Sequence, residues 1–158
     1  MEQLHLLPFR LGLHHLAVPV AEVVRVLPAL LWTELPGCPL SVDGVVNVRG
    51  RLLAQVDLAR CFGWPSPQLQ LWRPLIWLKL RDRHIVIPVD QVYSVMSCDP
   101  QQLMTSTDPQ INSNQLKGVI QTDNGIWLIQ DIEQLLSESD ELLLQQALKM
   151  ALEKELLV

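Results

Sequence analysis

The feature that most constrains the fold of this chain is an internal repeat. Residues 16–20, Leu-Ala-Val-Pro-Val, align with residues 85–89, Ile-Val-Ile-Pro-Val. The same offset aligns three further apolar positions: Val23 with Val92, Val26 with Val95, and Leu27 with Met96. Because chance rarely preserves register over so many positions, we expect two halves of similar structure.

A second pair of segments repeats later in each half. Residues 44–46, Gly-Val-Val, align with residues 118–120, Gly-Val-Ile, and the alignment continues without a gap. It then places Asp57-Leu58 on Asp131-Ile132. The repeated pattern therefore predicts the same elements in each half: a hairpin, a short third strand, a strand that begins with glycine, a tight turn, another strand and a short helix.

Turn and cap residues support this order of elements. Gly50 in the first half and Asn124-Gly125 in the second tolerate the positive φ that a two-residue hairpin connection requires. Asp57 and Asp131 stand where a strand ends and an apolar segment of helical spacing begins. A carboxylate there accepts hydrogen bonds from the free N–H groups of a helix start, so we expect both to be caps.

The composition favours one all-β domain with short helices. The chain has 158 residues, 49% of them hydrophobic, and its 11 prolines separate short runs rich in Val, Ile and Leu. Five short strands can form a small barrel, but a barrel of about 65 residues is marginal alone, so two barrels are expected to share a core. We predict a first barrel mainly within residues 4–63 and a second mainly within 73–137, forming one domain over residues 1–137.

Different patterns mark the connector and the C-terminus. Residues 63–68 carry one glycine and two prolines, which suit a connector between the barrels. Residues 138–158 predict a helix with Asp140 and Glu141 in its first turn. Its apolar face comprises Leu144, Leu148, Ala151 and Leu152. We expect this face to dock on a barrel, with partner binding as the alternative.

Charge and terminal patterns argue against several classes of function. The net charge of −5 and the lack of a Lys/Arg cluster argue against nucleic acid as a partner. Cys38, Cys61 and Cys98 belong to no C-x-x-C pair, as expected for reduced thiols. Glu2 stands where a signal peptide needs a basic region, and no apolar run approaches the roughly 18 residues of a membrane span. We therefore predict a cytoplasmic protein without direct membrane insertion.

No catalytic or metal-binding pattern can be assembled from the sequence. The histidines His5, His14, His15 and His84 lack the i, i+4 or alternate-strand spacing with a carboxylate that zinc sites display. The sequence also lacks a G-x-S-x-G elbow, a P-loop and a dinucleotide fingerprint. We predict a protein that is not an enzyme and uses no cofactor or metal.

Surface recognition remains, and Arg49 stands out as a candidate. It interrupts an apolar strand at a Gly turn and offers a planar, permanently charged group with several donors. Asn47 shares its face by the two-residue period of a strand. From the residues alone, Arg49 is either a recognition residue or an ordinary exposed turn residue.

Residues 43–58 resemble the signature of the CheW family of chemotaxis adaptors. They read Asp-Gly-Val-Val-Asn-Val-Arg-Gly-Arg-Leu-Leu-Ala-Gln-Val-Asp-Leu, which contains a G-V-x-N-x-R-G turn followed by a strand and Asp-Leu. Further segments fit the same family: residues 9–12, 89–90 and 118–136. The resemblance extends over roughly residues 4 to 137.

The resemblance implies a fold, two partners and a non-catalytic activity. The family fold is a pair of packed five-stranded SH3-like barrels with a hydrophobic groove between them. That groove receives the cytoplasmic helical tip of a chemoreceptor, and the domain also contacts the regulatory domain of a CheA-type histidine kinase. The chain is thus expected to couple receptors to the kinase in chemotaxis, phototaxis or pilus motility, at the inner face of the membrane where receptor arrays form.

By position, the resemblance also implies a receptor-binding set. It comprises Gly44, Asn47 and Arg49 from the motif and Val23, Val92 and Val95 from the apolar positions around the groove. Arg49 is expected to bridge to a carboxylate or a backbone carbonyl at the edge of the groove. Plain core packing is the alternative for the three valines.

Arg25 also belongs to this set, but it departs from the family pattern, because many members carry a glutamate there. The reversed charge is expected to change partner choice. Two alternative functions stay open: a decoy that binds the kinase without a receptor, and a small-barrel ligand-binding module or enzyme with a cavity between the halves.

Overall fold

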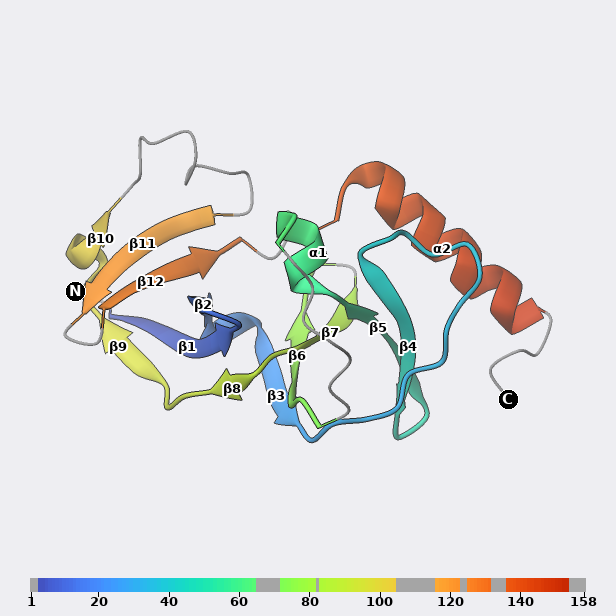
Figure 1. The fold of residues 1–158 in the computed structure, drawn as a ribbon, viewed down its shortest axis with the longest axis horizontal. Helices are drawn as coiled ribbons and strands as arrows, with labels where there is room; N and C mark the ends of the chain where they lie inside the picture. Colours follow the sequence, from blue (N-terminus) through green and yellow to red (C-terminus); the bar gives the residue numbers. More distant parts are fainter. Residues whose placement is uncertain are drawn as a thin grey trace.

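The computed structural model describes residues 3–64, 72–81, 83–104, 116–122, 125–131 and 136–153, and this part of the chain is mostly β. A seven-stranded sheet has the order β10 (Leu103–Met104), β11 (Leu116–Thr122), β12 (Gly125–Gln130), β2 (His14–Pro19), β1 (Leu4–Leu11) and β8 (Gln91–Val92), with β9 (Met96–Cys98) also paired to β1. A five-stranded sheet has the order β3 (Val23–Leu27), β6 (Leu75–Lys79), β7 (His84–Pro88), β5 (Arg51–Val56) and β4 (Val42–Val48). Short 3₁₀ helices cover Val20–Glu22 and Pro100–Gln102, and α-helices cover Leu58–Phe62 (α1) and Glu138–Glu153 (α2). The predicted all-β fold with two packed β units and a C-terminal helix is confirmed, and Figure 1 shows the two sheets side by side.

Each sheet takes its strands from both halves of the chain. The first hairpin, β1–β2, lies in the seven-stranded sheet with β8, β9, β11 and β12 of the second half. The second-half hairpin β6–β7 lies in the five-stranded sheet with β3, β4 and β5. The predicted division into barrels of residues 4–63 and 73–137 is therefore wrong. Apolar alternation determines which side chains are buried, but it does not determine which strand lies alongside.

The repeat reappears as an equivalent register in the two sheets. Leu6 pairs with Met96 in one sheet, and the aligned residues Leu75 and Leu27 pair in the other. The parallel pairs follow the same rule: Leu16 with Leu128 and Ile85 with Ala54. The sheets differ in number of strands because β8 and β9 both pair with β1 where β3 alone pairs with β6, and because β10 adds an edge strand.

The largest cluster of buried apolar residues in the described part of the chain lies between the two sheets. Phe9 and Leu16 reach it from the first hairpin, and Ile76 and Ile85 reach it from the second. All four side chains are 0% exposed. The clusters internal to each sheet are smaller. Because the shared cluster is the larger one, neither sheet is expected to be stable alone.

Local signals form as predicted at α1. The Asp57 side chain accepts a hydrogen bond from the Arg60 N–H at 3.3 Å, and Gly63 ends the helix with φ of 72°. These contacts satisfy backbone groups at both helix ends. The short helix predicted after Asp131 would begin at residue 132, and residues 132–135 lie outside the described part of the chain.

Helix α2 docks by its apolar face on the same side of the five-stranded sheet as the inter-sheet cluster, where Ala147 packs with Val45 of β4. Leu144 is 0% exposed and Leu148 packs against the same inter-sheet cluster. Ser137 accepts a hydrogen bond from the Asp140 N–H at 3.1 Å at the start of the helix. The predicted docking is thus confirmed for these leucines, and the side chains of residues 151 and 152 lie outside the described part. In Figure 1, α2 lies next to β4, on the side away from the seven-stranded sheet.

Candidate functional site

Each sheet ends in an edge strand that carries predicted site residues. Strand β3 is an edge of the five-stranded sheet, and β8 is an edge of the seven-stranded sheet. Figure 1 shows β3 and β8 near the junction of the sheets. Val23 on β3 and Val92 on β8 are equivalent in the repeat, and both are partly buried against the inter-sheet cluster. The structure therefore brings these two predicted residues to one region, as packed residues at its base.

Exposed valines extend this region to the surface. Val24 is 40% exposed, Val26 is 43% exposed and Val95 is 55% exposed. We call the set Val23, Val24, Val26, Val92 and Val95 the edge-strand surface. An edge strand also presents backbone groups that no neighbouring strand pairs, so such a surface can accept an additional chain.

Arg25 places an exposed cation on β3, next to this surface in sequence. It is exposed and follows an irregularity in the pairing of β3 with β6, between Val23 and Arg25. Its backbone lies opposite Trp77 of β6. Trp77 belongs to the cluster internal to the five-stranded sheet, whereas Ile76, opposite Val26, belongs to the inter-sheet cluster, so Arg25 and Val26 leave β3 on opposite faces.

The motif residues lie elsewhere, on the β4–β5 hairpin at the opposite edge of the five-stranded sheet from β3. Gly44 has a structural role there, because a Cβ atom would stand 2.8 Å from the carbonyl carbon of Thr33. Thr33 and Val45 exchange two backbone hydrogen bonds, of 2.7 and 2.9 Å. Only glycine allows this close approach without a shift of the backbone.

Asn47 and Arg49 shape the tip of this hairpin. Arg49 has φ of 52° and Gly50 has φ of 85°, so both central residues of the turn adopt the left-handed conformation of a tight hairpin. Asn47 Oδ1 accepts a hydrogen bond from the Gly50 N–H at 2.7 Å. The two-residue turn predicted at Gly50 is confirmed. Residues 123 and 124 of the equivalent turn lie outside the described residues.

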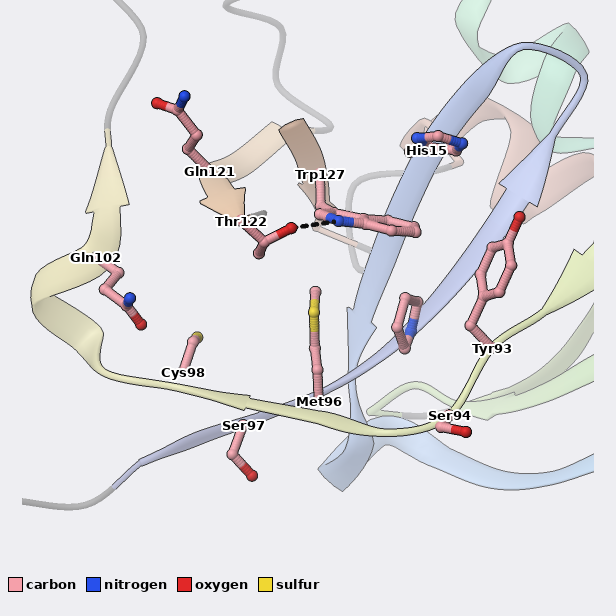
Figure 2. A pocket seen from close by; sticks show the side chains of 11 residues that line it. His15, Tyr93, Ser94, Met96, Ser97, Cys98, Gln102, Gln121, Thr122 and Trp127 are labelled. Atoms are coloured by element: carbon pink, nitrogen blue, oxygen red, sulfur yellow. Dashed lines mark hydrogen bonds between the residues drawn. The ribbon is translucent and has the colours of Figure 1, made fainter. Parts of the chain in front are cut away.

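A pocket of about 930 Å³ opens in the seven-stranded sheet, next to the edge-strand surface. Trp127 is its aromatic centre: His15 stacks on it at 4.7 Å between ring centroids, and Tyr93 meets it edge-on at 5.6 Å. Thr122 Oγ1 accepts a hydrogen bond from the Trp127 indole N–H at 3.1 Å. Figure 2 shows Met96 pointing toward Trp127 from below.

The segment from β8 to β9 connects the pocket with the edge-strand surface. Val92 and Val95 belong to the surface, while Tyr93, Ser94 and Met96 line the pocket. None of the pocket residues was predicted from the sequence to belong to a binding site. Two signals were available: Tyr93 is the single tyrosine of the chain, and Met96 is an aligned apolar position of the repeat.

The buried ionisable groups near α1 serve the structure. Burial raises the pKa of the Asp43 carboxyl, while the hydrogen bond from Gln55 Nε2, of 2.9 Å, lowers it. Burial also raises the pKa of the Cys61 thiol to about 11. Within the described ranges, no group of three or more His, Cys, Asp or Glu side chains is placed to hold a metal ion.

No helix in the described part of the chain combines the length and the apolarity needed to cross a membrane.

The interleaved sheets, with an apolar surface at their junction, define a small all-β domain of two packed sheets. The family model of the CheW-like domain matches residues 5–140, and the chain therefore belongs to the CheW-like domain family. The structure aligns with the scaffolding protein TtCheW from Thermoanaerobacter tengcongensis with a TM-score of 0.79 and 19% identity, over 89% of this chain and 92% of that one.

Two relatives are similar in sequence. Chemotaxis protein CheW of Thermotoga maritima is 25% identical over 138 residues, which cover 87% of this chain and 91% of the relative. Protein PilI of Pseudomonas aeruginosa is 36% identical over 87 residues, which cover 55% of this chain and 49% of the relative.

Proposed function

We propose that this chain is a non-catalytic adaptor that couples chemoreceptors to a CheA-type histidine kinase in a chemotaxis, phototaxis or pilus-motility pathway. Membership of the CheW-like family and similarity to a chemotaxis protein support the proposal. The structural observation that carries it is the exposed valine surface at the junction of β3 and β8. The proposal places the chain in the cytoplasm, at the inner face of the membrane when receptors recruit it.

The receptor's cytoplasmic helical tip would lie along the edge-strand surface. An amphipathic helix buries apolar side chains at every third or fourth position, and Val24, Val26 and Val95 offer the complementary area. A larger apolar side chain would enter the aromatic pocket between Tyr93 and Met96. Val23 and Val92 would form the base of the contact.

The cations would set the orientation of the receptor. Arg25 would pair with a receptor carboxylate beside the valines. Arg49 is proposed to make a second polar contact, to a carboxylate or a carbonyl, from the tip of the β4–β5 hairpin. Gly44 and Asn47 would act indirectly, by holding the hairpin in the shape that presents Arg49.

Binding measurements with both partners test this function. The purified protein is titrated by calorimetry with the kinase regulatory domain and, separately, with a receptor cytoplasmic hairpin. Wild type should bind both, whereas Val26→Glu and Arg49→Glu should lose affinity for the receptor alone. Leu13→Glu is the matched control, because Leu13 is 97% exposed in the β1–β2 turn.

Absence of binding to either partner would refute the adaptor function. Binding to the kinase without the receptor would favour the decoy, for which the exposed Arg25 of the edge strand β3 is the supporting observation. In that case Arg25→Glu should restore receptor binding, because it returns the charge that many family members carry.

A further inference from the structure

A second cavity lies away from the edge-strand surface, between the five-stranded sheet and α2. Its volume is about 530 Å³, which is within the range of small-molecule sites. Its basic lining residues come from three elements: Arg51 begins β5, Arg83 and His84 lie at the start of β7, and Lys149 lies on α2. No acidic residue is among the described residues that line it.

The cations of this cavity are only partly neutralised. Arg83 donates to Glu141 of α2 at 2.6 Å, and its side chain is 13% exposed. Its Nε–H is buried and has no hydrogen-bond partner among the described residues. With Glu141 counted against Arg83, the charges of Arg51 and Lys149 leave the cavity with a surplus of positive charge in a chain whose net charge is −5.

An aromatic group holds the Arg51 side of the cavity in place. The Arg51 guanidinium lies 5.8 Å from the centroid of the Trp77 ring. The Trp77 indole N–H donates to His84 Nδ1 at 2.9 Å, so this histidine is fixed in orientation. Burial lowers the pKa of His84, and the charges of Arg51 and Lys79 lower it further. The lowered pKa is consistent with the unbalanced positive charge.

We propose that this cavity binds a small phosphate ester. Three features favour a phosphate over a single carboxylate. A phosphate monoester carries about two negative charges at neutral pH, which match the surplus of Arg51 and Lys149. Its several oxygens can accept from donors on different elements, because Arg51, Arg83 and Lys149 come from three separate segments. The planar guanidinium groups suit phosphate geometry.

Magnetic resonance on the full chain tests the site. The indole N–H resonance of Trp77 reports on the cavity through His84, a lining residue whose ring accepts its hydrogen bond. Inorganic phosphate and glycerol 3-phosphate are titrated separately, and sodium chloride at matched ionic strength is the reference. We expect saturable shifts of this resonance with both phosphates, with tighter binding of the ester because the cavity has room beyond one phosphate, and no saturable shift with chloride.

Single-charge variants assign the effect to the cavity. Arg51→Gln and Lys149→Gln should each weaken phosphate binding roughly threefold to tenfold. Arg10→Gln is the matched control, because it removes one positive charge from the other sheet, where Arg10 lies 3.9 Å from Asp90. Lys149 is exposed on α2, so its variant should fold even if the Arg51 variant does not.

Equal shifts with phosphate and chloride, or equal weakening by Arg10→Gln, would overturn the proposal. Failure of the receptor and kinase titrations would leave it untouched, because its readout needs neither partner.

Discussion

Val23 and Val92 occupy equivalent positions of the two repeated halves, and both pack against the cluster of buried residues between the sheets. Each lies on an edge strand, and the strands belong to different sheets. The two halves of the chain therefore each contribute one edge strand to the region that carries the exposed valines. The affinity of a partner that contacts both strands would therefore depend on the relative position of the two sheets.

Gly44→Ala should destabilise the fold strongly. The added Cβ would meet the Thr33 carbonyl, which is backbone, so relief requires movement of a hydrogen-bonded segment. We expect a loss of about 2–3 kcal/mol in the free energy of unfolding, measured by urea denaturation. Gly12→Ala is the control, because Gly12 has φ of +60° and open space, so it should lose only about 1 kcal/mol. Equal losses would show that the Thr33 contact is unimportant.

Asn47→Ala should loosen the β4–β5 hairpin. The variant removes the 2.7 Å hydrogen bond to the Gly50 N–H, and an exposed bond of this kind contributes about 1 kcal/mol. Asn47→Asp keeps an acceptor at the same place and should retain most of the stability. Thermal unfolding distinguishes the two variants. If aspartate and alanine were equally destabilising, the acceptor would not be the important feature.

Acidification should weaken the fold through His84. Burial and the nearby charges of Arg51 and Lys79 lower its pKa in the folded state, so the unfolded state takes up the proton first as the pH falls. The stabilising contribution of neutral His84 is complete above its ordinary pKa of about 6.5 and is lost as the pH falls below that value. Protonation of Nδ1 would also remove the acceptor for the Trp77 indole.

Urea denaturation at about pH 7 and about pH 5 measures this effect. The free energy of unfolding should fall more in wild type than in His84→Gln. His5→Gln, near the start of β1, is the control and should retain the dependence of wild type. A His84→Gln variant with the same pH dependence as wild type would contradict the prediction.

Cys61 should be unreactive in the folded protein. Its thiol has a pKa of about 11 because burial disfavours the thiolate, which is the reactive form. In a Cys38→Ser, Cys98→Ser variant, Cys61 should react with a maleimide at pH 8 roughly a hundredfold more slowly when folded than when unfolded. The same variant in denaturant supplies the reference rate, and comparable rates would mean that Cys61 is not protected.

Features that depend on residues close together in the sequence were predictable from the sequence. The cap at Asp57, the turn at Gly50 and the docking of Leu144 each follow from a few residues and their spacing. The position of Val23 relative to Val92 was partly accessible, because the repeat made the two equivalent. The roles of Gly44 and Asn47 within the hairpin were not recognised, because they depend on a carbonyl of Thr33 and on the conformation of the turn.

The strands, their buried faces and the two-fold repetition could be predicted from the amino-acid sequence. The exchange of hairpins between the halves could not: β1–β2 pairs with strands of the second half, and β6–β7 pairs with strands of the first. The physical reason is that strand pairing joins residues far apart in the chain, and the same apolar alternation can be buried against either of two similar neighbours. The aromatic pocket and the basic cavity have the same origin, since each combines side chains that long-range pairing or helix docking brings together.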